Sequence, residues 1–202
     1  VNVWAPAGAR GKKLPVLFWI YGGGFVNGGA SPAVYDGSAL ARAGVVVVSF
    51  NYRVGRFGFF AHPALTAAGE GPVGNWGLMD QQAALRWTRD NVAAFGGDPR
   101  RVTIMGESAG GMSVLSLLGA PAARGLFRGA IVLSGGGRTA SQQRELARDL
   151  PGAPSAETIG LNFAKSVGVE GTDATALAAL RALPAERIVS GLNLASLFAP
   201  PA

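Results

Sequence analysis

The sequence predicts an α/β fold with a mostly parallel sheet flanked by helices, and three observations lead to that prediction. Short apolar runs alternate along the chain with longer stretches of helical pattern, as a parallel sheet requires. The short runs lack polar alternation, which is typical of strands covered on both faces. The chain has 31 glycines and 49% hydrophobic residues, which suits an interior punctuated by tight turns.

The predicted strands lie near residues 14–20, 45–50, 102–107 and 129–134. The second contains four consecutive valines, Val45 to Val48, whose β-branched side chains favour extended backbone. The longest helix is expected from about Leu78 to Phe95, where Gly96 and Gly97 end it. After Gly135 the pattern becomes helical, with segments expected near 141–150, 155–167 and 173–190.

The segment from Gly106 to Gly110 has the spacing of a nucleophile elbow, Gly-Glu-Ser-Ala-Gly, directly after an apolar run. A strand, a sharp turn and a helix would expose the Ser108 hydroxyl, and glycines two residues before and after it avoid collisions. No other serine in the chain has glycine on both sides at this spacing. The alternative is a strand-to-helix turn that merely contains a serine.

A second glycine-rich segment, Gly22 to Gly24, follows the apolar run 14–20. Such a loop lets backbone N–H groups approach an oxygen that gains charge during acyl transfer. A flexible turn or a phosphate-binding loop is the alternative. It fits less well, because the Gly-x-Gly-x-x-Gly register fails at Asn27 and the Walker pattern fails at Pro6.

Five segments together resemble the type-B carboxylesterase/lipase family, which includes the cholinesterases. The matching segments run in the family's order: FWIYGGGF (18–25), SFNYRVGRFGFFAHP (49–63), GNWGLMDQQAALRW (74–87), FGGDPRRVTIMGESAGG (95–111) and LFRGAIVLSG (126–135). The resemblance implies an α/β-hydrolase fold with an incomplete sheet, and hydrolysis of carboxylic esters through an acyl-enzyme without a cofactor. A non-catalytic, cholinesterase-like binding or adhesion module is the alternative.

The resemblance also implies roles for individual residues. Ser108 would be the nucleophile, with Glu107 in support. Backbone N–H groups of three residues would form the oxyanion hole: Gly23, Gly24 and Ala109. A structural salt bridge would join Arg53 and Asp80. The chain departs from the family at Arg56, which replaces a small residue, and at Gly136, where many relatives carry a serine.

The order of a catalytic triad in this fold is serine, acid, histidine. The only histidine, His62, precedes Ser108, so a structural role is expected for it. The resemblance also implies that the triad acid lies well beyond Ala202, so we expect a fragment that lacks the triad acid and histidine and is inactive alone. It would form one partial domain over residues 1–202, with a sheet core at 1–135 and a helical segment at 136–202 that helps to wall the active-site gorge.

Composition limits the possible partners. The net charge of +6 arises from dispersed arginines rather than a basic stripe with aromatics, so nucleic acid is not expected as a partner. The absence of cysteine rules out a disulfide and a thiolate metal site in this segment, and no metal site is expected. No apolar run is long enough to span a membrane. The expected partner is a small-molecule ester. The resemblance alone favours a secreted or periplasmic location, and the oligomeric state is left open.

Overall fold

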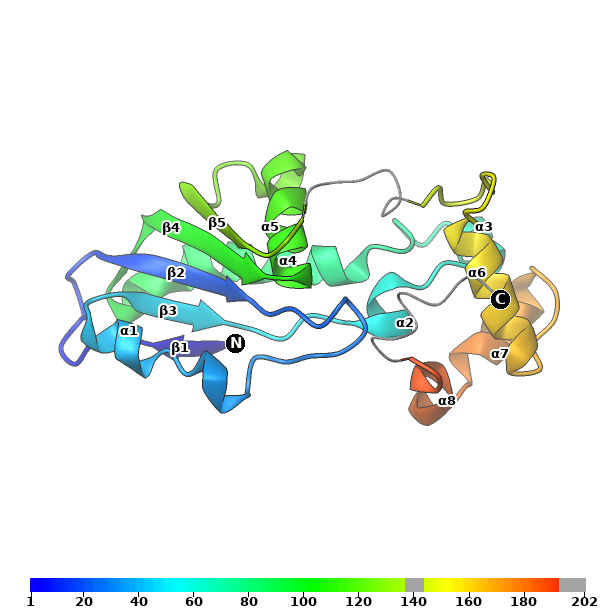
Figure 1. Cartoon of the computed structure of the whole chain (residues 1–202), viewed down its shortest axis with the longest axis horizontal. Coiled ribbons are helices and arrows are strands. Elements are labelled where there is room, and N and C mark those ends of the chain that lie inside the picture. Colours follow the sequence, from blue (N-terminus) through cyan, green and yellow to red (C-terminus); the bar gives the residue numbers. More distant parts are fainter. Residues whose placement is uncertain (137–143, 193–202) are drawn as a thin grey trace. The chain divides into compact units, whose positions relative to one another are not determined.

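The structure, a computed structural model, describes residues 1–136 and 144–192 and divides the chain into two compact units (Figure 1). Residues 1–52 and 78–136 form the first, which we call the sheet unit. Residues 53–77 and 144–192 form the second, which we call the helical unit. Segment 53–77 thus groups with the later helices, and the predicted role of 136–202 in walling a gorge stays a prediction.

The sheet unit is built on five strands in the order β1-β3-β2-β4-β5. Only β1 runs antiparallel to its neighbour, and the other strands pair in parallel. The bounds are β1 Asn2–Trp4, β2 Leu14–Ile20, β3 Val46–Ser49, β4 Gly97–Glu107 and β5 Gly129–Leu133. All four predicted strands are present. The short β1 was not predicted, since three residues carry too little pattern.

Register brings the carboxyl ends of the central strands together. Ile20 pairs with Gly106 across β2 and β4, and Glu107 pairs with Leu133 across β4 and β5. In open parallel sheets, ligands bind at the carboxyl ends of the strands. The predicted glycine loop follows β2 and the predicted elbow follows β4, so both begin at this edge.

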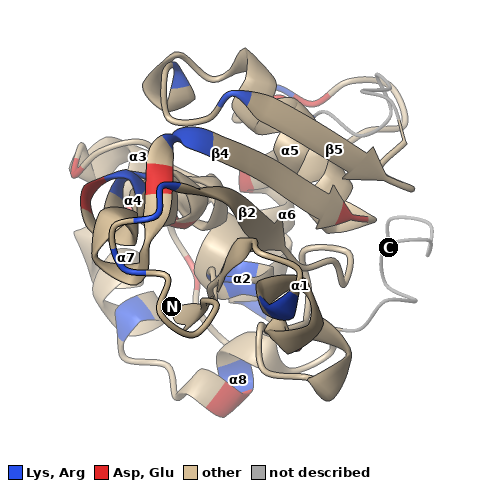
Figure 2. Cartoon of the chain, turned by 90° about the vertical axis from the view of Figure 1, so that its left-hand side faces the viewer, with Lys and Arg blue, Asp and Glu red and all other residues tan. Residues whose placement is uncertain are grey.

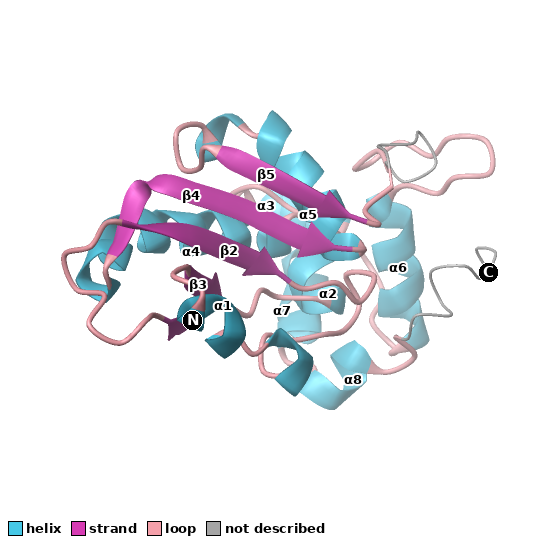
Figure 3. Cartoon of the chain, turned by 60° about the vertical axis from the view of Figure 1, so that its left-hand side comes forward, coloured by secondary structure: helices cyan, strands magenta, loops and turns pink. Residues whose placement is uncertain are grey.

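Helices cover both faces of this sheet. In Figure 3, α4 and α5 lie behind the strands and α1 lies in front of them. The helical elements are α1 Ser38–Arg42, α4 Trp76–Asn91, α5 Ala109–Gly119 and the short 3-10 helices η1 Ala33–Tyr35, η2 Val92–Phe95 and η3 Pro121–Ala123. The core between them includes Phe18, Val48, Leu85, Ile104 and Val114, all fully buried. Each such side chain stabilises the fold by about 1.5–3 kcal/mol.

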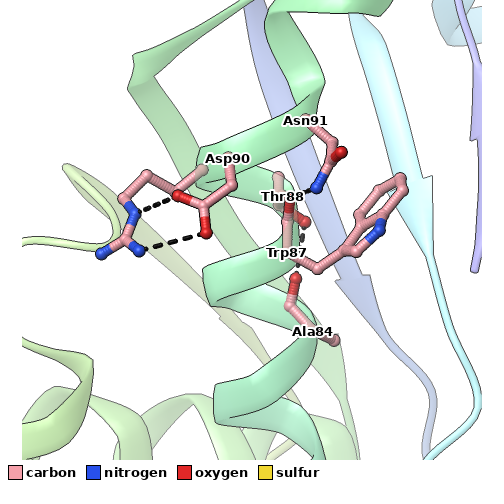
Figure 4. Close-up of polar contacts among 6 residues, drawn as sticks. Ala84, Trp87, Thr88, Asp90 and Asn91 are labelled. Carbon is pink, nitrogen blue, oxygen red and sulfur yellow. Dashed lines mark hydrogen bonds and ion pairs between the residues drawn. The ribbon is translucent and has the colours of Figure 1, made fainter.

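The predicted long helix is present as α4 followed by η2. Near its end, the Thr88 hydroxyl donates to the Ala84 carbonyl at 2.9 Å and the Asn91 side chain donates to the Trp87 carbonyl at 2.8 Å (Figure 4). Gly96 then adopts a left-handed conformation, with φ of 87°. A left-handed glycine is a common helix stop, so the predicted end of this helix is confirmed.

The helical unit packs short helices around a small apolar core. Its helices are α2 Gly55–Phe59, α3 Pro63–Ala68, α6 Ala156–Ser166, α7 Ala174–Arg181 and α8 Ala185–Val189. The core consists of Ala164, Val169, Ala176 and Leu180, with partly buried Phe60, Phe163, Val167 and Leu183 packed against it. Helix α6 confirms the segment predicted at 155–167.

Two predicted helices need correction. Residues 144–150 of the segment expected at 141–150 are not helical, and 141–143 lie outside the described residues. The Asp149 carboxylate instead accepts from the Ser155 N–H at 2.7 Å, across a turn containing Pro151 and Gly152. The segment expected at 173–190 is two helices, because Pro184 has no N–H to donate to a preceding turn.

Arg56, which the sequence left unexplained, has a structural role in the helical unit. Its guanidinium donates to the carbonyls of Ile188 at 2.7 Å and Ser190 at 2.9 Å, at the end of α8. The same group lies 4.0 Å from the centre of the Phe163 ring. These contacts tie α2 to α6 and α8, and burial lowers the pKa of Arg56.

Candidate active site

Ser108 occupies a sharp turn between β4 and α5, and its backbone conformation is rare. Its φ is 55° and its ψ is −120°, outside the regions that non-glycine residues normally adopt. Such a conformation costs about 1–3 kcal/mol and persists only where surrounding contacts enforce it. The Ser108 N–H donates to the Leu133 carbonyl at 2.9 Å, which fixes the turn to β5. The residue as a whole is half-buried.

Glycines around Ser108 let three backbone segments meet. A Cβ on Gly106 would collide with the Gly110 carbonyl, and a Cβ on Gly110 would collide with the Ile20 carbonyl of β2. A Cβ on Gly111 would lie 2.8 Å from the Gly135 Cα. The spacing of glycines in the sequence therefore corresponds to a real steric requirement of the turn.

The glycine loop after β2 lies directly against this turn. A Cβ on Gly22 would lie 2.7 Å from the Glu107 carbonyl oxygen and 3.1 Å from the Ser108 Cβ. Gly23 and Gly24 follow with φ of 108° and 63°, values that favour glycine. The structure thus brings together two segments that are more than eighty positions apart in the sequence.

Among the described residues, the backbone N–H groups of the predicted oxyanion residues donate to no backbone acceptor. The Gly23 carbonyl accepts from the N–H groups of Val26 and Asn27, but within residues 1–136 and 144–192 no acceptor takes the N–H of Gly23 or Gly24. Ala109 is the first residue of α5, where the N–H has no partner inside the helix. The helix dipole adds a partial positive charge at this end.

Two tyrosines that the sequence analysis missed anchor the glycine loop. The Tyr21 hydroxyl donates to the Tyr52 carbonyl, and the Tyr52 hydroxyl donates to the Tyr21 carbonyl, each at 2.9 Å. Their rings stack with centroids 4.4 Å apart. Burial raises the pKa of both phenols, so they remain neutral donors. Tyr21 immediately precedes Gly22, so this pair fixes where the loop begins.

A second polar network lies beneath the first turn of α5. Gln81 of α4 donates through Nε2 to the Ser113 hydroxyl at 3.0 Å, and that hydroxyl donates to the Ala109 carbonyl at 2.9 Å. Both side chains are fully buried. The Gln81 Oε1 atom is also buried and has no hydrogen-bond partner among the described residues.

The remaining predicted residues lie as follows. Glu107 is half-buried at the end of β4, next to Ser108. Arg53 belongs to the helical unit and Asp80 to the sheet unit, and their salt bridge stays a prediction. Gly136 is in a left-handed conformation with φ of 59°.

His62 has a structural role in the helical unit. It is fully buried, and its Nδ1 accepts from the Ala64 N–H at 3.2 Å, which caps α3. Burial lowers the pKa of His62, partly offset by the negative charge of Glu157. The imidazole is therefore held in its neutral form.

A serine on such a turn, facing a glycine loop, is the arrangement of an α/β-hydrolase. The sequence model of the carboxylesterase family matches residues 1–198, and the chain belongs to that family.

Named relatives support this placement. The chain is 44% identical over its whole length to a para-nitrobenzyl esterase of Bacillus subtilis (strain 168), and covers 40% of that protein. It is 53% identical over 67% of its length to the acetylcholinesterase of Electrophorus electricus, and covers 21% of it. The chain thus spans less than half the length of these relatives.

Solved structures agree on the fold. A carboxylesterase from Geobacillus stearothermophilus aligns with 93% of this chain and 36% of its own, at a TM-score of 0.79 and 43% identity. The predicted α/β-hydrolase fold, with a mostly parallel sheet flanked by helices, is confirmed.

Other features of the described residues bear on ligands. Among residues 1–136 and 144–192, no three histidine, cysteine, aspartate or glutamate side chains gather as a metal site would require. No helix in the described ranges is both long enough and apolar enough to cross a bilayer. Lysine and arginine positions are spread over several elements (Figure 2).

Proposed function

We propose that the intact protein is a serine carboxylic-ester hydrolase in which Ser108 forms the acyl-enzyme. The observation that supports this most is the close approach of Gly22 to the elbow, where an added Cβ would lie 2.7 Å from the Glu107 carbonyl oxygen. This close approach supports a site in which the Ser108 hydroxyl and the N–H donors of the glycine loop act together at one edge of the sheet. That combination serves acyl transfer.

The proposed reaction follows from these groups. Ser108 Oγ attacks the ester carbonyl while a histidine takes its proton, and the N–H groups of Gly23, Gly24 and Ala109 stabilise the oxyanion. The protonated histidine gives that proton to the departing alkoxide, which leaves as the alcohol, and water then hydrolyses the acyl-enzyme by the same steps to release the acid and restore Ser108. Glu107 is proposed to favour the imidazolium that forms during attack. The substrate is a small-molecule ester, and no residue in the sequence supplies the histidine after Ser108.

Active-site labelling tests this proposal. Full-length protein should react with a fluorophosphonate at one site per chain, and peptide mapping should place the adduct on Ser108. Ser108→Ala should lower kcat for nitrophenyl esters by roughly a million-fold and abolish labelling. An isolated 1–202 chain should neither hydrolyse the ester nor label quickly.

The non-catalytic module is the competing outcome of the same experiment. Full-length protein that is folded but neither labels nor hydrolyses nitrophenyl esters would support the module and contradict the enzyme. Rapid stoichiometric labelling of the isolated chain would instead contradict the need for a downstream histidine.

A further inference from the structure

We propose that Gln81 and Ser113 are positioning residues, which hold the first turn of α5 and thereby aim the Ala109 N–H at the oxyanion. This inference rests on the proposed function, because it concerns the same site. Neither side chain belongs to the predicted triad or oxyanion hole.

The hydrogen-bond chain has one self-consistent direction. The Gln81 amide nitrogen can only donate, so the Ser113 hydroxyl accepts from it and has its own proton free for the Ala109 carbonyl. If the amide were flipped, the Gln81 oxygen and the Ala109 carbonyl oxygen would both need the single proton of the Ser113 hydroxyl. The glutamine therefore fixes the rotation of the hydroxyl, and the hydroxyl in turn fixes the Ala109 carbonyl.

These bonds complete the set that surrounds the strained turn. The Ser108 N–H is held by Leu133 and the Ser108 carbonyl accepts from the Met112 N–H, each at 2.9 Å. The Ser113 hydroxyl then holds the Ala109 carbonyl at 2.9 Å. Carbonyls on both sides of the Ala109 N–H are thus restrained, so this N–H cannot tilt freely as Ser108 relaxes.

Stability alone does not account for glutamine at position 81. Its Oε1 is buried without a partner among the described residues, and an unpaired buried acceptor destabilises the folded state. An apolar side chain of similar length would avoid that cost. A role in orienting the α5 turn explains why a donor is present in spite of it.

The chain offers a closely matched control. Ser116, one turn further along α5, donates to the Met112 carbonyl at 3.1 Å and so makes the same type of bond four residues back. Its bond does not involve Ala109. Both variants lose a hydrogen bond from a serine hydroxyl to the carbonyl four residues back, but only Ser113→Ala loses the contact with Ala109. Comparing them therefore isolates the effect of the Ala109 contact.

The experiment measures ester hydrolysis by full-length protein, with kcat calculated per site titrated by fluorophosphonate. Ser113→Ala should lower kcat about tenfold, well short of the roughly 100–1000-fold loss that follows removal of an oxyanion donor. KM should stay unchanged, because the ground-state ester gains little from this N–H. The inhibition constant of a trifluoromethyl ketone, whose adduct carries an oxyanion, should rise by the same factor. Ser116→Ala should change neither kcat nor this constant.

A second variant covers the case in which Ser113→Ala does not fold. Gln81→Met removes the donor but keeps the length of the side chain, and it should lower kcat in the same direction. The inference would be overturned if a folded Ser113→Ala or Gln81→Met variant had the same kcat and the same inhibition constant as Ser116→Ala. That result would leave the proposed function intact. Unaltered protein that neither labels nor hydrolyses would instead remove the proposed function itself.

Discussion

Each of the two units is held together internally by a different kind of contact. Around Ser108, backbone segments meet at glycines, and the supporting side chains, such as Tyr21 and Gln81, form neutral hydrogen bonds. In the helical unit, charged side chains join helices: Arg56 joins α2 to α8, and the Glu157 carboxylate of α6 accepts from the Thr66 hydroxyl of α3. The candidate site should therefore respond mainly to added volume, whereas the helical unit, besides its apolar core, should also respond to changes of charge.

The largest effect is expected from added volume beneath the elbow. Gly110→Ala would force a Cβ into the Ile20 carbonyl and should lower the free energy of unfolding by more than about 4 kcal/mol. Gly125→Ala is the control, because its φ is 78° but its surroundings are open, so only about 1–2 kcal/mol of backbone strain is expected. Urea unfolding of full-length protein measures both. If the two variants lost the same free energy of unfolding, close packing at the elbow would not be the cause of the destabilisation.

The next effect tests charge in the helical unit. Arg56→Met removes two charge-assisted hydrogen bonds and the contact with Phe163, and should destabilise by roughly 2–3 kcal/mol. Hydrogen exchange of the α8 amides should show the loss locally. Arg187→Met removes the same charge from an exposed position on α8, so it should change the hydrogen exchange of the α8 amides little. Similar exchange in both variants would mean that Arg56 does not hold α8.

A smaller effect should appear as pH dependence. The pKa of His62 is lowered in the folded chain, so below about pH 6.5 the unfolded chain binds the proton more readily and stability falls. One histidine can change the free energy of unfolding by no more than about 1.4 kcal/mol per pH unit. His62→Asn keeps a capping acceptor for Ala64 without titrating.

Melting between pH 7 and pH 5 measures this contribution as the difference between parent and His62→Asn protein. The parent should lose more stability than the variant over this range. If both proteins lost the same stability between pH 7 and pH 5, His62 would not contribute to the pH dependence.

The smallest effect is expected at the surface. Arg181 and Glu70 form an ion pair in which the side chains are 53% and 60% exposed. Exposed pairs contribute less than about 1 kcal/mol and are screened by salt. Glu70→Gln should therefore lower the melting temperature slightly at low ionic strength and have no effect at 1 M salt. A large, salt-independent loss would place this pair among the main supports of the helical unit.

Local sequence pattern was sufficient for part of this structure. The elbow and the glycine loop could be predicted because their glycines sit at fixed spacings after apolar runs. The pairs Tyr21–Tyr52 and Gln81–Ser113 could not, since each joins residues more than thirty positions apart and depends on the finished fold. Between residues 144 and 190, proline and glycine broke segments whose overall composition favoured helix.

In the proposed site, the N–H groups of Gly23, Gly24 and Ala109 face the ester carbonyl oxygen, which gains negative charge when Ser108 attacks. A crystal structure of the full-length protein with a phosphonate bound covalently tests it most directly. We expect phosphorus on Ser108 Oγ and its oxygen about 2.7–3.1 Å from these three nitrogens. Phosphorus on another residue, or an oxygen directed away from the glycine loop, would contradict the account.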